Sequence, residues 1–367
     1  MKIMQNNEYY IWAAGTYGRR LINFIRDNAP ALKITAFIDN DTKKQGTTYQ
    51  NLPVISWAEA KPNVPRTKII ISLSLPTQVR DFLLNDGYKE NIDFYSEFTF
   101  LPRFFWTTEK RIVTPNVLIF TNNSCVCSCD GCYAYIPYVK KPFVSSMESF
   151  KNTADLMFKH FDKCLNINIV GGETLLNKNV ADLCVYLRTN YAHKFATMNI
   201  ATSGLLIPSD DEMRKFAFAK TEFSISDYTK TVKNAATNLP LLIEKCQNFG
   251  VHCYRDRQCD REVWFDLGNP YKISITDPEE LKRRFNKCFK TVTSCFDGKL
   301  FGCFMQHWRW LATGISEPHG DDSFDLNQEV TEESREALFK ILSYQPELGY
   351  HTGCAHCNGT FTPYLNS

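Results

Sequence analysis

The sequence of 367 residues has no excess of either charge, no long apolar run and no cysteine before position 125. Lys and Arg number 42 against 40 Asp and Glu, so the chain lacks the basic surface that attracts nucleic acid or an anionic membrane. No stretch reaches the roughly 18 apolar residues of a membrane-spanning helix, and the N-terminus shows no signal-peptide pattern. We therefore expect a cytoplasmic protein with no membrane span and no nucleic-acid partner.

Fourteen cysteines are present, and they are unevenly placed. In a reducing compartment such a number indicates metal binding or catalysis rather than a disulfide framework. Two groups bracket the middle of the chain: Cys125, Cys127, Cys129 and Cys132 form the first, and Cys288, Cys295, Cys303, Cys354 and Cys357 form the second. The others are scattered, and we expect most of them to be buried small apolar residues: Cys164, Cys184, Cys246, Cys253 and Cys259.

Residues 1–97 are predicted to form a small βαβ domain. Strand, turn and helix follow one another in "YYIWAAGTYGRRLINFIRD", and further strands are expected in "KITAFIDND" and "TKIIISLS". The turn is a partial dinucleotide-type loop whose glycines, Gly15 and Gly18, would let backbone N–H groups approach a phosphate. Asp39 ends the second strand, where a ribose contact is usual. The first glycine of the fingerprint is replaced by Ala13, which leaves two alternatives: nucleotide binding, or a structural docking domain.

The segment "FIDNDTKKQGTTYQNLPVIS" resembles the N-terminal Rossmann-like domains of sugar acetyltransferases and other polysaccharide-biosynthesis proteins. That resemblance implies a nucleotide or nucleotide-sugar as the ligand of this domain.

Residues 98–115 are expected to be a linker, and residues 116–284 to alternate strands with helices. Strands are predicted at 116–122, 166–172, 195–203, 221–227, 251–257 and 262–268, with helical apolar spacing between them. Six such repeats predict an α/β fold with a parallel sheet, either open or as a partial (β/α)6 barrel. Ligands of such sheets bind at the carboxyl ends of the strands, and the first cysteine group directly follows the first of these strands.

Cys125, Cys129 and Cys132 have the spacing C-x3-C-x2-C. Three thiolates on one short loop can hold three irons of a [4Fe–4S] cubane and leave the fourth iron open for a ligand. A structural zinc site would need four protein ligands, commonly as two C-x2-C pairs. Cys127 is a candidate fourth thiolate, but four ligands within eight residues would be crowded. We interpret Cys127 as a bystander.

This loop resembles that of the radical S-adenosylmethionine (SAM) superfamily, and three later stretches match the family in order and placement: "VGGETLL", "ATSG" and "SISD". The resemblance covers roughly residues 115–270. It implies that a reduced cluster cleaves SAM to methionine and a 5′-deoxyadenosyl radical, which abstracts hydrogen from a small-molecule substrate. It also implies an electron donor such as flavodoxin or ferredoxin. One departure is Gly131, which stands where an aromatic residue often precedes the last cysteine.

The residues that the resemblance assigns to SAM lie at successive strand ends. Gly171, Gly172 and Glu173 would hold the methionine amino group, Thr202 and Ser203 would supply a further polar contact, and Ser224, Ser226 and Asp227 would contact the ribose. Tyr133 would pack on the adenine. Taken singly these residues fit ordinary roles, such as a helix cap or an acid in a first helical turn.

The second cysteine group, in residues 285–367, begins with the spacing C-x9-G-x4-C, from Cys288 to Cys303. A hairpin with its turn at Asp297–Gly298 is predicted to carry Cys303. The spacing resembles the start of the SPASM and twitch extensions of radical SAM enzymes, which hold auxiliary [4Fe–4S] clusters. The cysteine count implies one auxiliary cluster, with Cys288, Cys303, Cys354 and Cys357 as its ligands and Cys295 as the competing one. A zinc knuckle of the same cysteines is the alternative.

Other residues near these sites are weaker candidates. Cys253 and Cys259 fall near the end of the fifth strand, where either thiol would be able to return a hydrogen atom to a substrate radical in an epimerase. Arg255 is a candidate clamp for a phosphate or carboxylate. His307, His351 and His356 lie near the second cysteine group, and we interpret them as surface histidines.

Three functions therefore follow from the sequence. The first is a radical SAM oxidoreductase or epimerase acting on a nucleotide-linked sugar or polyol of a surface-polysaccharide pathway. The second is a radical SAM peptide maturase. Such enzymes usually carry an N-terminal winged-helix domain, whereas residues 1–97 are predicted to form a βαβ domain. The third, from another class, is a zinc-stabilised nucleotide-binding protein.

Overall fold

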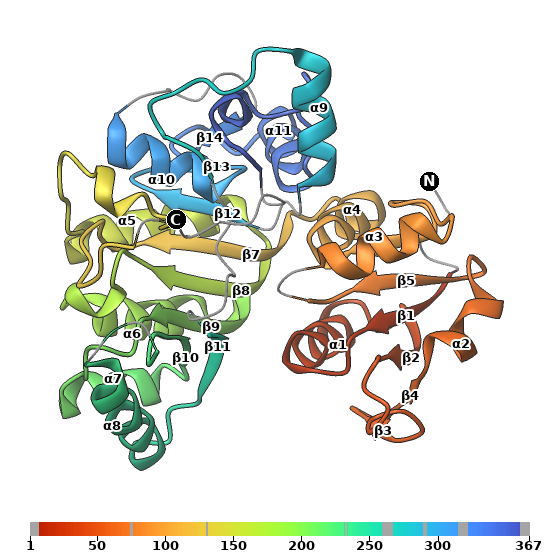
Figure 1. Cartoon of the computed structure of the whole chain (residues 1–367), viewed down its shortest axis with the longest axis horizontal. Helices are drawn as coiled ribbons and strands as arrows, with labels where there is room; N and C mark the ends of the chain where they lie inside the picture. The colour runs from red at the N-terminus through yellow and green to blue at the C-terminus, as the bar shows by residue number, and fades with distance from the viewer. Residues whose placement is uncertain are drawn as a thin grey trace. The chain divides into compact units, whose positions relative to one another are not determined.

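The computed structural model describes residues 7–73, 76–129, 131–230, 232, 234–258, 267–288, 292–314 and 322–359. The chain divides into two compact units, Met1–Pro115 and Asn116–Ser367. Both are mixed α/β structures built on largely parallel sheets (Figure 1). Among the described helices, none has both the length and the apolar character that crossing a membrane requires.

The first unit is a six-stranded sheet in the order β3-β4-β2-β1-β5-β6. Only the pairing of β3 with β4 is antiparallel. Its strands are β1 (Glu8–Trp12), β2 (Lys33–Ile38), β3 (Thr48–Tyr49), β4 (Leu52–Ile55), β5 (Thr67–Ile71) and β6 (Phe94–Ser96). Its helices are α1 (Thr16–Asn28), α2 (Trp57–Ala60), α3 (Thr77–Asn85) and α4 (Glu97–Glu109). The three strands predicted for this region are present as β1, β2 and β5.

Helix α4 occupies the segment that the sequence analysis treats as a linker. Ser96 caps its start by accepting a hydrogen bond from the Thr99 backbone N–H. The aromatic residues between 98 and 106 are buried rather than exposed, so this helix packs as part of the first unit's core. Pro102 lies inside the helix, and a proline there together with clustered aromatic residues concealed the helical pattern in the sequence.

The second unit is an eight-stranded sheet in the order β11-β10-β9-β8-β7-β12-β13-β14. Strands β8 to β11 are mutually parallel, β12 is parallel to β7, and β12, β13 and β14 form an antiparallel extension. The strands are β7 (Val113–Phe120), β8 (Lys163–Val170), β9 (Phe195–Thr202), β10 (Glu222–Asp227), β11 (Cys253–Gln258), β12 (Thr293–Phe296), β13 (Lys299–Phe301) and β14 (Ser323–Asp325).

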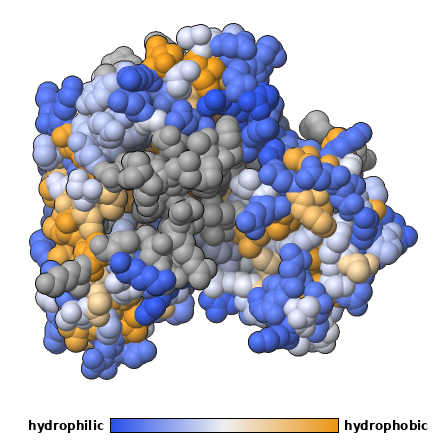
Figure 2. All heavy atoms as spheres, viewed as in Figure 1, coloured by the Kyte–Doolittle hydropathy of each residue, from blue (hydrophilic) through white to orange (hydrophobic). Residues whose placement is uncertain are grey.

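The helices of this unit follow the predicted alternation up to β11. They are α5 (Met147–His160), α6 (Val180–Tyr191), α7 (Asp210–Phe218), α8 (Ala235–Asn248), α9 (Pro278–Lys287), α10 (Phe304–Thr313) and α11 (Glu332–Leu342), with short 3-10 turns η2 (Ile136–Tyr138), η3 (Thr174–Leu176) and η6 (Thr352–His356). Helix α9 is strongly hydrophilic on the face drawn in Figure 2. The sixth predicted strand, 262–268, lies almost wholly outside the described residues.

The predicted hairpin before Cys303 is confirmed. Asp297 and Gly298 both have positive φ, 48° and 74°, as a two-residue turn between antiparallel strands requires. The hairpin ends at Phe301, and Cys303 then caps the start of α10.

Candidate functional site

The first cysteine group lies on the loop that leaves β7. Cys125, Cys129 and Cys132 are all half-buried there. The loop is folded by its own backbone: Cys132 N–H donates to the Cys129 carbonyl at 3.1 Å, and Tyr135 N–H donates to the Cys132 carbonyl at 3.0 Å. The Cys127 backbone N–H donates to the Cys125 sulfur at 3.4 Å. Such N–H contacts stabilise a thiolate, which is the form that binds metal.

The four sulfur atoms of this loop are not equivalent. The Cys127 side chain interacts with both Cys125 and Cys129, and those contacts, followed by burial, raise the pKa of Cys127. The contact from Cys127 lowers the pKa of Cys125, while burial raises the pKa of Cys132 to about 11. The Cys127 thiol therefore lies within hydrogen-bonding reach of both neighbouring sulfurs, and the interpretation of Cys127 as a bystander stays a prediction.

Two glycines at the end of β8 let the cysteine loop approach closely. A Cβ on Gly172 would lie 2.3 Å from the Ser124 carbonyl oxygen, and one on Gly171 would lie 2.7 Å from the Asn122 amide nitrogen. The backbones are joined at the same place, because Gly172 N–H donates to the Asn122 carbonyl at 3.1 Å and Glu173 N–H donates to the Ser124 carbonyl at 2.8 Å. At Gly172 the obstacle is the backbone of the loop, so any side chain there would move the loop, whereas at Gly171 the obstacles are the side chains of Asn122 and Thr121.

Glu173 joins the end of β8 to the end of β9. Its side chain is buried, and Oε1 accepts from Thr202 Oγ1 at 2.9 Å and from Leu175 N–H at 3.1 Å. Oε2 accepts from Ser203 N–H at 2.9 Å and also from Ser203 Oγ. A carboxylate has about four acceptor positions, and protein donors fill them here. Contact between Glu173 and a SAM amino group stays a prediction that requires one of these donors to give way.

The end of β10 also reaches the cysteine loop. The Cys129 thiol donates a hydrogen bond to the Tyr228 hydroxyl, with the sulfur and oxygen 3.9 Å apart. Asp227 is buried and accepts from Thr229 N–H at 2.9 Å and from Arg255 Nη1 at 3.0 Å. Ser224 is buried beside it in β10 and Ser226 is half-buried. The ends of β8 and β10 thus contact the cysteine loop through Gly172 and Tyr228, and Glu173 links the end of β9 to the end of β8.

Sequence reasoning missed the residues that connect these elements. Asn122 follows β7, and its amide donates to the Glu173 carbonyl at 3.0 Å while its oxygen accepts from Ser124 N–H at 3.0 Å. Tyr228 was missed in the same way. Neither stands in a recognisable motif, and only their positions directly after a strand could have drawn attention to them. Tyr133, predicted to pack on adenine, is half-buried within the loop.

The two cysteines proposed as hydrogen donors have different outcomes. The Cys253 side chain contacts Cys246 of helix α8; burial and then this contact raise the pKa of Cys246 to about 12. Cys253 therefore lies on the side of β11 that faces the helix layer, and not among the residues around the cysteine loop. Cys259 lies outside the described residues. Arg255 is more than half exposed and is paired with Asp227.

Four cysteines of the second group line one cavity of about 60 Å³. Cys288 ends α9, Cys303 precedes α10, and Cys354 and Cys357 lie in and directly after η6. The wall also includes the polar residues Tyr135, Arg284, Gln306, Arg309 and His351. Three separate elements therefore bring together the four predicted ligands.

The four cysteines of this cavity are half-buried, and their thiols face its interior. Burial, reinforced by the neighbouring cysteines, raises the pKa of Cys303 to about 12, and burial raises the pKa of Cys357 to about 11. The pKa of Cys354 is raised by burial as well. Metal binding to these cysteines must therefore release protons. Cys295, the competing ligand, is not in the cavity wall; it is fully buried in β12, where burial raises its pKa.

Two histidines near the second group are buried, so the interpretation of surface histidines is wrong for them. His307 is fully buried and its ring stacks on Phe301 with centroids 3.9 Å apart. His351 is also buried. Their neighbours come from distant parts of the chain, and no local pattern reports such burial. Among the scattered cysteines, the expected burial is confirmed for Cys164, Cys184 and Cys246.

Tyr135 connects the two cysteine groups. It follows Cys132 by three residues and is bonded to the Cys132 carbonyl through its backbone N–H. Its buried side chain lines the four-cysteine cavity, beside Arg309. Burial raises the pKa of Tyr135 well above its ordinary value, so the hydroxyl keeps its proton. The wall of one cysteine site is therefore continuous with the loop of the other.

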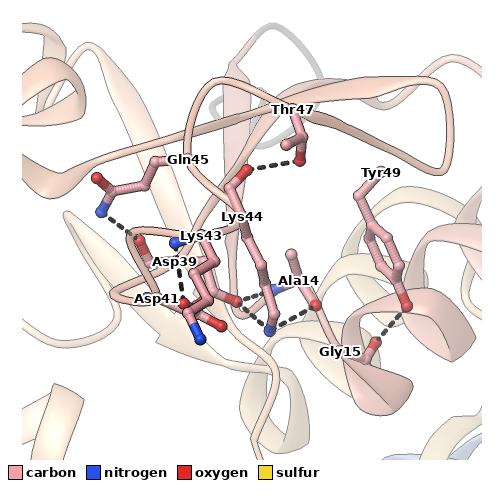
Figure 3. Close-up of polar contacts among 9 residues, drawn as sticks. All are labelled: Ala14, Gly15, Asp39, Asp41, Lys43, Lys44, Gln45, Thr47 and Tyr49. Atoms are coloured by element: carbon pink, nitrogen blue, oxygen red, sulfur yellow. Dashed lines mark hydrogen bonds and ion pairs between the residues drawn. The ribbon is translucent and has the colours of Figure 1, made fainter.

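Around the glycine loop of the first unit, the Asp39 carboxylate is hydrogen-bonded to neighbouring groups of the same unit (Figure 3). Asp39 Oδ2 accepts from Ala14 N–H at 2.9 Å and from Lys44 Nζ at 3.1 Å, and Oδ1 accepts from Asp41 N–H at 2.9 Å. Burial alone would raise the pKa of Asp39, but these hydrogen bonds bring it below its ordinary value. The acid predicted to contact a ribose is thus engaged within the unit, and nucleotide binding there stays a prediction.

The two glycines of that loop serve different purposes. A Cβ on Gly18 would lie 2.2 Å from the Ala13 carbonyl oxygen, so Gly18 is required for α1 to pack against the loop. Gly15 has no atom within 4 Å of such a Cβ, and its carbonyl accepts from the Tyr49 hydroxyl at 3.1 Å. Ala13, where the fingerprint has its first glycine, has φ of 100°.

Within the described part of the chain, no three His, Cys, Asp or Glu side chains are placed to hold a single metal ion.

No family model and no curated protein matches the sequence. Two solved structures are similar in part. Native anSMEcpe with bound AdoMet and Cp18Cys peptide has a TM-score of 0.32 and 15% identity, over 49% of this chain and 50% of that one.

BtrN in complex with AdoMet and 2-DOIA has a TM-score of 0.40 and 13% identity, over 67% of this chain and 94% of that one. The match thus spans about half of anSMEcpe and most of BtrN. Both TM-scores lie below 0.5, so the assignment of function rests on the geometry of the site.

Proposed function

We propose that this protein is a radical SAM enzyme with a second, auxiliary iron–sulfur site. The observation that carries the proposal is the assembly around Cys125, Cys129 and Cys132. Gly171–Gly172 pack against the cysteine loop, Glu173 ties that contact to the end of β9, and Tyr228 brings the end of β10 to Cys129. A chance C-x3-C-x2-C sequence gives no reason for three strand ends to converge on it.

The donor sets fit iron–sulfur clusters. Three thiols on one loop suit a cluster with one iron left for another ligand, and four thiols around one cavity suit a fully ligated one. Cys125, Cys129 and Cys132 would hold the first, and Cys288, Cys303, Cys354 and Cys357 the second. When bound and reduced, the first cluster would supply the electron that cleaves SAM to methionine and a 5′-deoxyadenosyl radical.

The chain's own residues position these partners. Gly171 and Gly172 let the start of the cysteine loop pack directly against the end of β8, which fixes the position of the loop. Glu173 acts as a positioning residue, because its four hydrogen bonds fix both strand ends. Ser226, half-buried at the end of β10, is the best placed of the predicted ribose contacts, since the Asp227 carboxylate already accepts from Thr229 and Arg255.

For the outcome of the reaction we favour oxidation over epimerisation. Epimerisation needs a hydrogen donor near the substrate; of the two candidates, Cys253 contacts Cys246 of α8 instead, and Cys259 lies outside the described residues. A second cysteine site connected to the first loop by Tyr135 offers a place for the electron that a substrate loses on oxidation. The substrate class would be a nucleotide-linked sugar or polyol of a surface-polysaccharide pathway, a link supported by the resemblance of residues 37–56 alone.

The peptide-maturase alternative is less well supported. Such enzymes usually carry a winged-helix domain at the N-terminus, whereas the first unit is built on a largely parallel six-stranded sheet. The zinc-protein alternative predicts a colourless sample, while two cubanes predict about eight irons per chain.

The test is anaerobic reconstitution followed by incubation with SAM and dithionite. We expect about eight irons per chain and formation of 5′-deoxyadenosine. Zinc in place of iron, or iron without any 5′-deoxyadenosine, would contradict the proposal. With candidate nucleotide-sugars added, a product lighter by about two hydrogen masses indicates oxidation, since a dehydrogenation removes two hydrogens. Deuterium uptake from heavy water, with no mass change in ordinary water, indicates epimerisation.

A further inference from the structure

Two polar atoms of the four-cysteine site are buried with no hydrogen-bond partner among the described residues. They are Nε2 of His351 and Oε1 of Gln306. Both side chains belong to the cavity wall, and His351 is only 3% exposed. A buried polar atom without a partner costs about 1–3 kcal/mol, so each such atom in a folded protein calls for an explanation.

Both residues are held by one buried carboxylate, that of Asp322. Oδ1 lies 3.0 Å from His351 Nδ1, and Oδ2 accepts from Gln306 Nε2 at 2.9 Å and from Thr352 N–H at 2.7 Å. The Thr352 hydroxyl donates to Oδ2 as well. A carboxylate surrounded by donors acts as an acceptor, so the proton of the imidazole lies on Nδ1. In a neutral imidazole the lone pair is then on Nε2.

The imidazole is also held in position by packing. Phe285 meets it edge-on, with ring centroids 5.2 Å apart. On the other nitrogen's side lies Gly302, where an added Cβ would come within 2.9 Å of Cε1 and 3.1 Å of Nε2. The lack of a side chain there leaves room for the ring against the residue that precedes Cys303. The orientation of Nε2 is therefore determined by Asp322, Phe285 and Gly302 together.

We infer that His351 Nε2 is a nitrogen ligand of the metal group held by the four-cysteine site, with Asp322 as its positioning residue. The inference rests on the auxiliary-cluster part of the proposed function. A ligating histidine typically gives its other N–H to a carboxylate, which fixes the tautomer and the ring orientation. Here that carboxylate is present and the ligating nitrogen is the one without a protein partner. A [4Fe–4S] cluster takes one protein ligand on each of its four irons, so His351 holds the iron that one of the four cysteines would otherwise hold.

The test uses the full chain with Cys125, Cys129 and Cys132 changed to Ala, so that only the second site can hold a cluster. After anaerobic reconstitution and reduction, pulsed EPR should show a strong nitrogen hyperfine coupling, which changes to the 15N pattern when the protein is labelled with 15N-histidine. Changing His351→Ala should abolish this coupling. Changing His356→Ala should leave it unchanged, because His356 neighbours Cys357 but is outside the cavity wall.

Two further variants keep the test decisive if His351→Ala binds no iron. His351→Cys should retain a cluster, lose the nitrogen coupling and lower the reduction potential, because thiolate in place of imidazole lowers the potential. Asp322→Asn should weaken the coupling. A cluster with no strong nitrogen coupling in the unchanged second site overturns the inference and leaves the proposed function standing. If the second site binds no iron at all, both the proposed auxiliary cluster and this inference are wrong. Cleavage of SAM by the unmodified chain is a separate measurement and tests the first cluster.

Discussion

The two units place very different chemistry at the same edge of similar sheets. In both, polar residues gather where parallel strands end. In the first unit these groups satisfy one another: Asp39 takes up donors from Ala14, Asp41 and Lys44. In the second unit the carboxylates of Glu173 and Asp227 are satisfied in the same way, but two of the strand ends also adjoin the loop that carries Cys125, Cys129 and Cys132. The fold alone therefore does not determine function, and the loops that follow the strands decide it.

The largest expected effect tests the second unit. Changing Cys132→Ala removes one of three ligands and should reduce 5′-deoxyadenosine formation to background, with loss of the first cluster's EPR signal. Cys127→Ala is the matched control in the same loop. It should retain iron and most activity, because Cys125, Cys129 and Cys132 complete the C-x3-C-x2-C set without Cys127. Equal loss in both variants would show that Cys127 is a ligand.

A glycine-to-alanine pair compares the two edges directly. Gly172→Ala places a Cβ 2.3 Å from the Ser124 carbonyl and should destabilise the protein by about 1–3 kcal/mol and lower its iron content. Gly15→Ala, in the first unit, meets no atom within 4 Å and should have little effect on stability. Denaturant unfolding and iron analysis measure both. A neutral Gly172→Ala would contradict the close approach of the two backbones.

Glu173→Gln tests the connection between β8 and β9. In Gln, an NH2 group replaces one of the two acceptor oxygens. This NH2 group would face N–H and O–H donors, either those of Ser203 or those of Leu175 and Thr202. We therefore expect a loss of about 1–3 kcal/mol in the free energy of unfolding and weaker SAM binding. Glu148→Gln, exposed in the first turn of α5, is the control and should bind SAM normally. Calorimetric titration of SAM into reconstituted protein distinguishes them.

The first unit should respond to pH through Glu97. This residue is buried, and burial raises its pKa from 4.5 to about 7 despite a hydrogen bond from Ser72. The folded state then holds a proton that the unfolded state has lost, so stability falls as pH rises from about 4.5 towards 7 and levels off above. Glu97→Gln should remove this slope. Unfolding free energies at several pH values check it, and an unchanged slope would contradict the burial of an ionisable Glu97.

The smallest effect is expected at Ala13. Its φ of 100° is costly for alanine, and Ala13→Gly should stabilise the first unit by roughly 0.5 kcal/mol after the entropy of glycine is subtracted. Ala29 has φ of −144°, and Ala29→Gly should destabilise instead. Thermal unfolding measures both variants. If Ala13→Gly does not stabilise the protein, the backbone at Ala13 is unstrained.

The sequence predicted the elements whose signals are local. Four helices of the second unit and five of its strands lie where the apolar periodicity placed them, and the Asp297–Gly298 turn is confirmed. The start of β7 at Val113 and helix α4 were missed, because Pro102 and the dense aromatic residues conceal the helical period. Local spacing also identified the cysteine loop.

The remainder of the site depends on contacts between distant segments. Tyr135 and His351 reach the same cavity from positions more than two hundred residues apart. Asp322 contacts His351 across a separation of 29 residues. Neither apolar periodicity nor a sequence motif predicts these contacts, since they arise only when α9, α10 and η6 pack together. The same holds for Cys253, whose orientation towards α8 is fixed by the pleat of β11.

The central claim is that three cysteines leave one iron of the first cluster open to SAM. EPR spectroscopy of the reduced protein, with Cys288 and Cys303 changed to Ala so that only the first cluster contributes, tests it directly. Addition of SAM should change the g-values of the signal, and 15N at the methionine amino group should produce a new nitrogen coupling. A spectrum that SAM leaves unchanged would contradict the account.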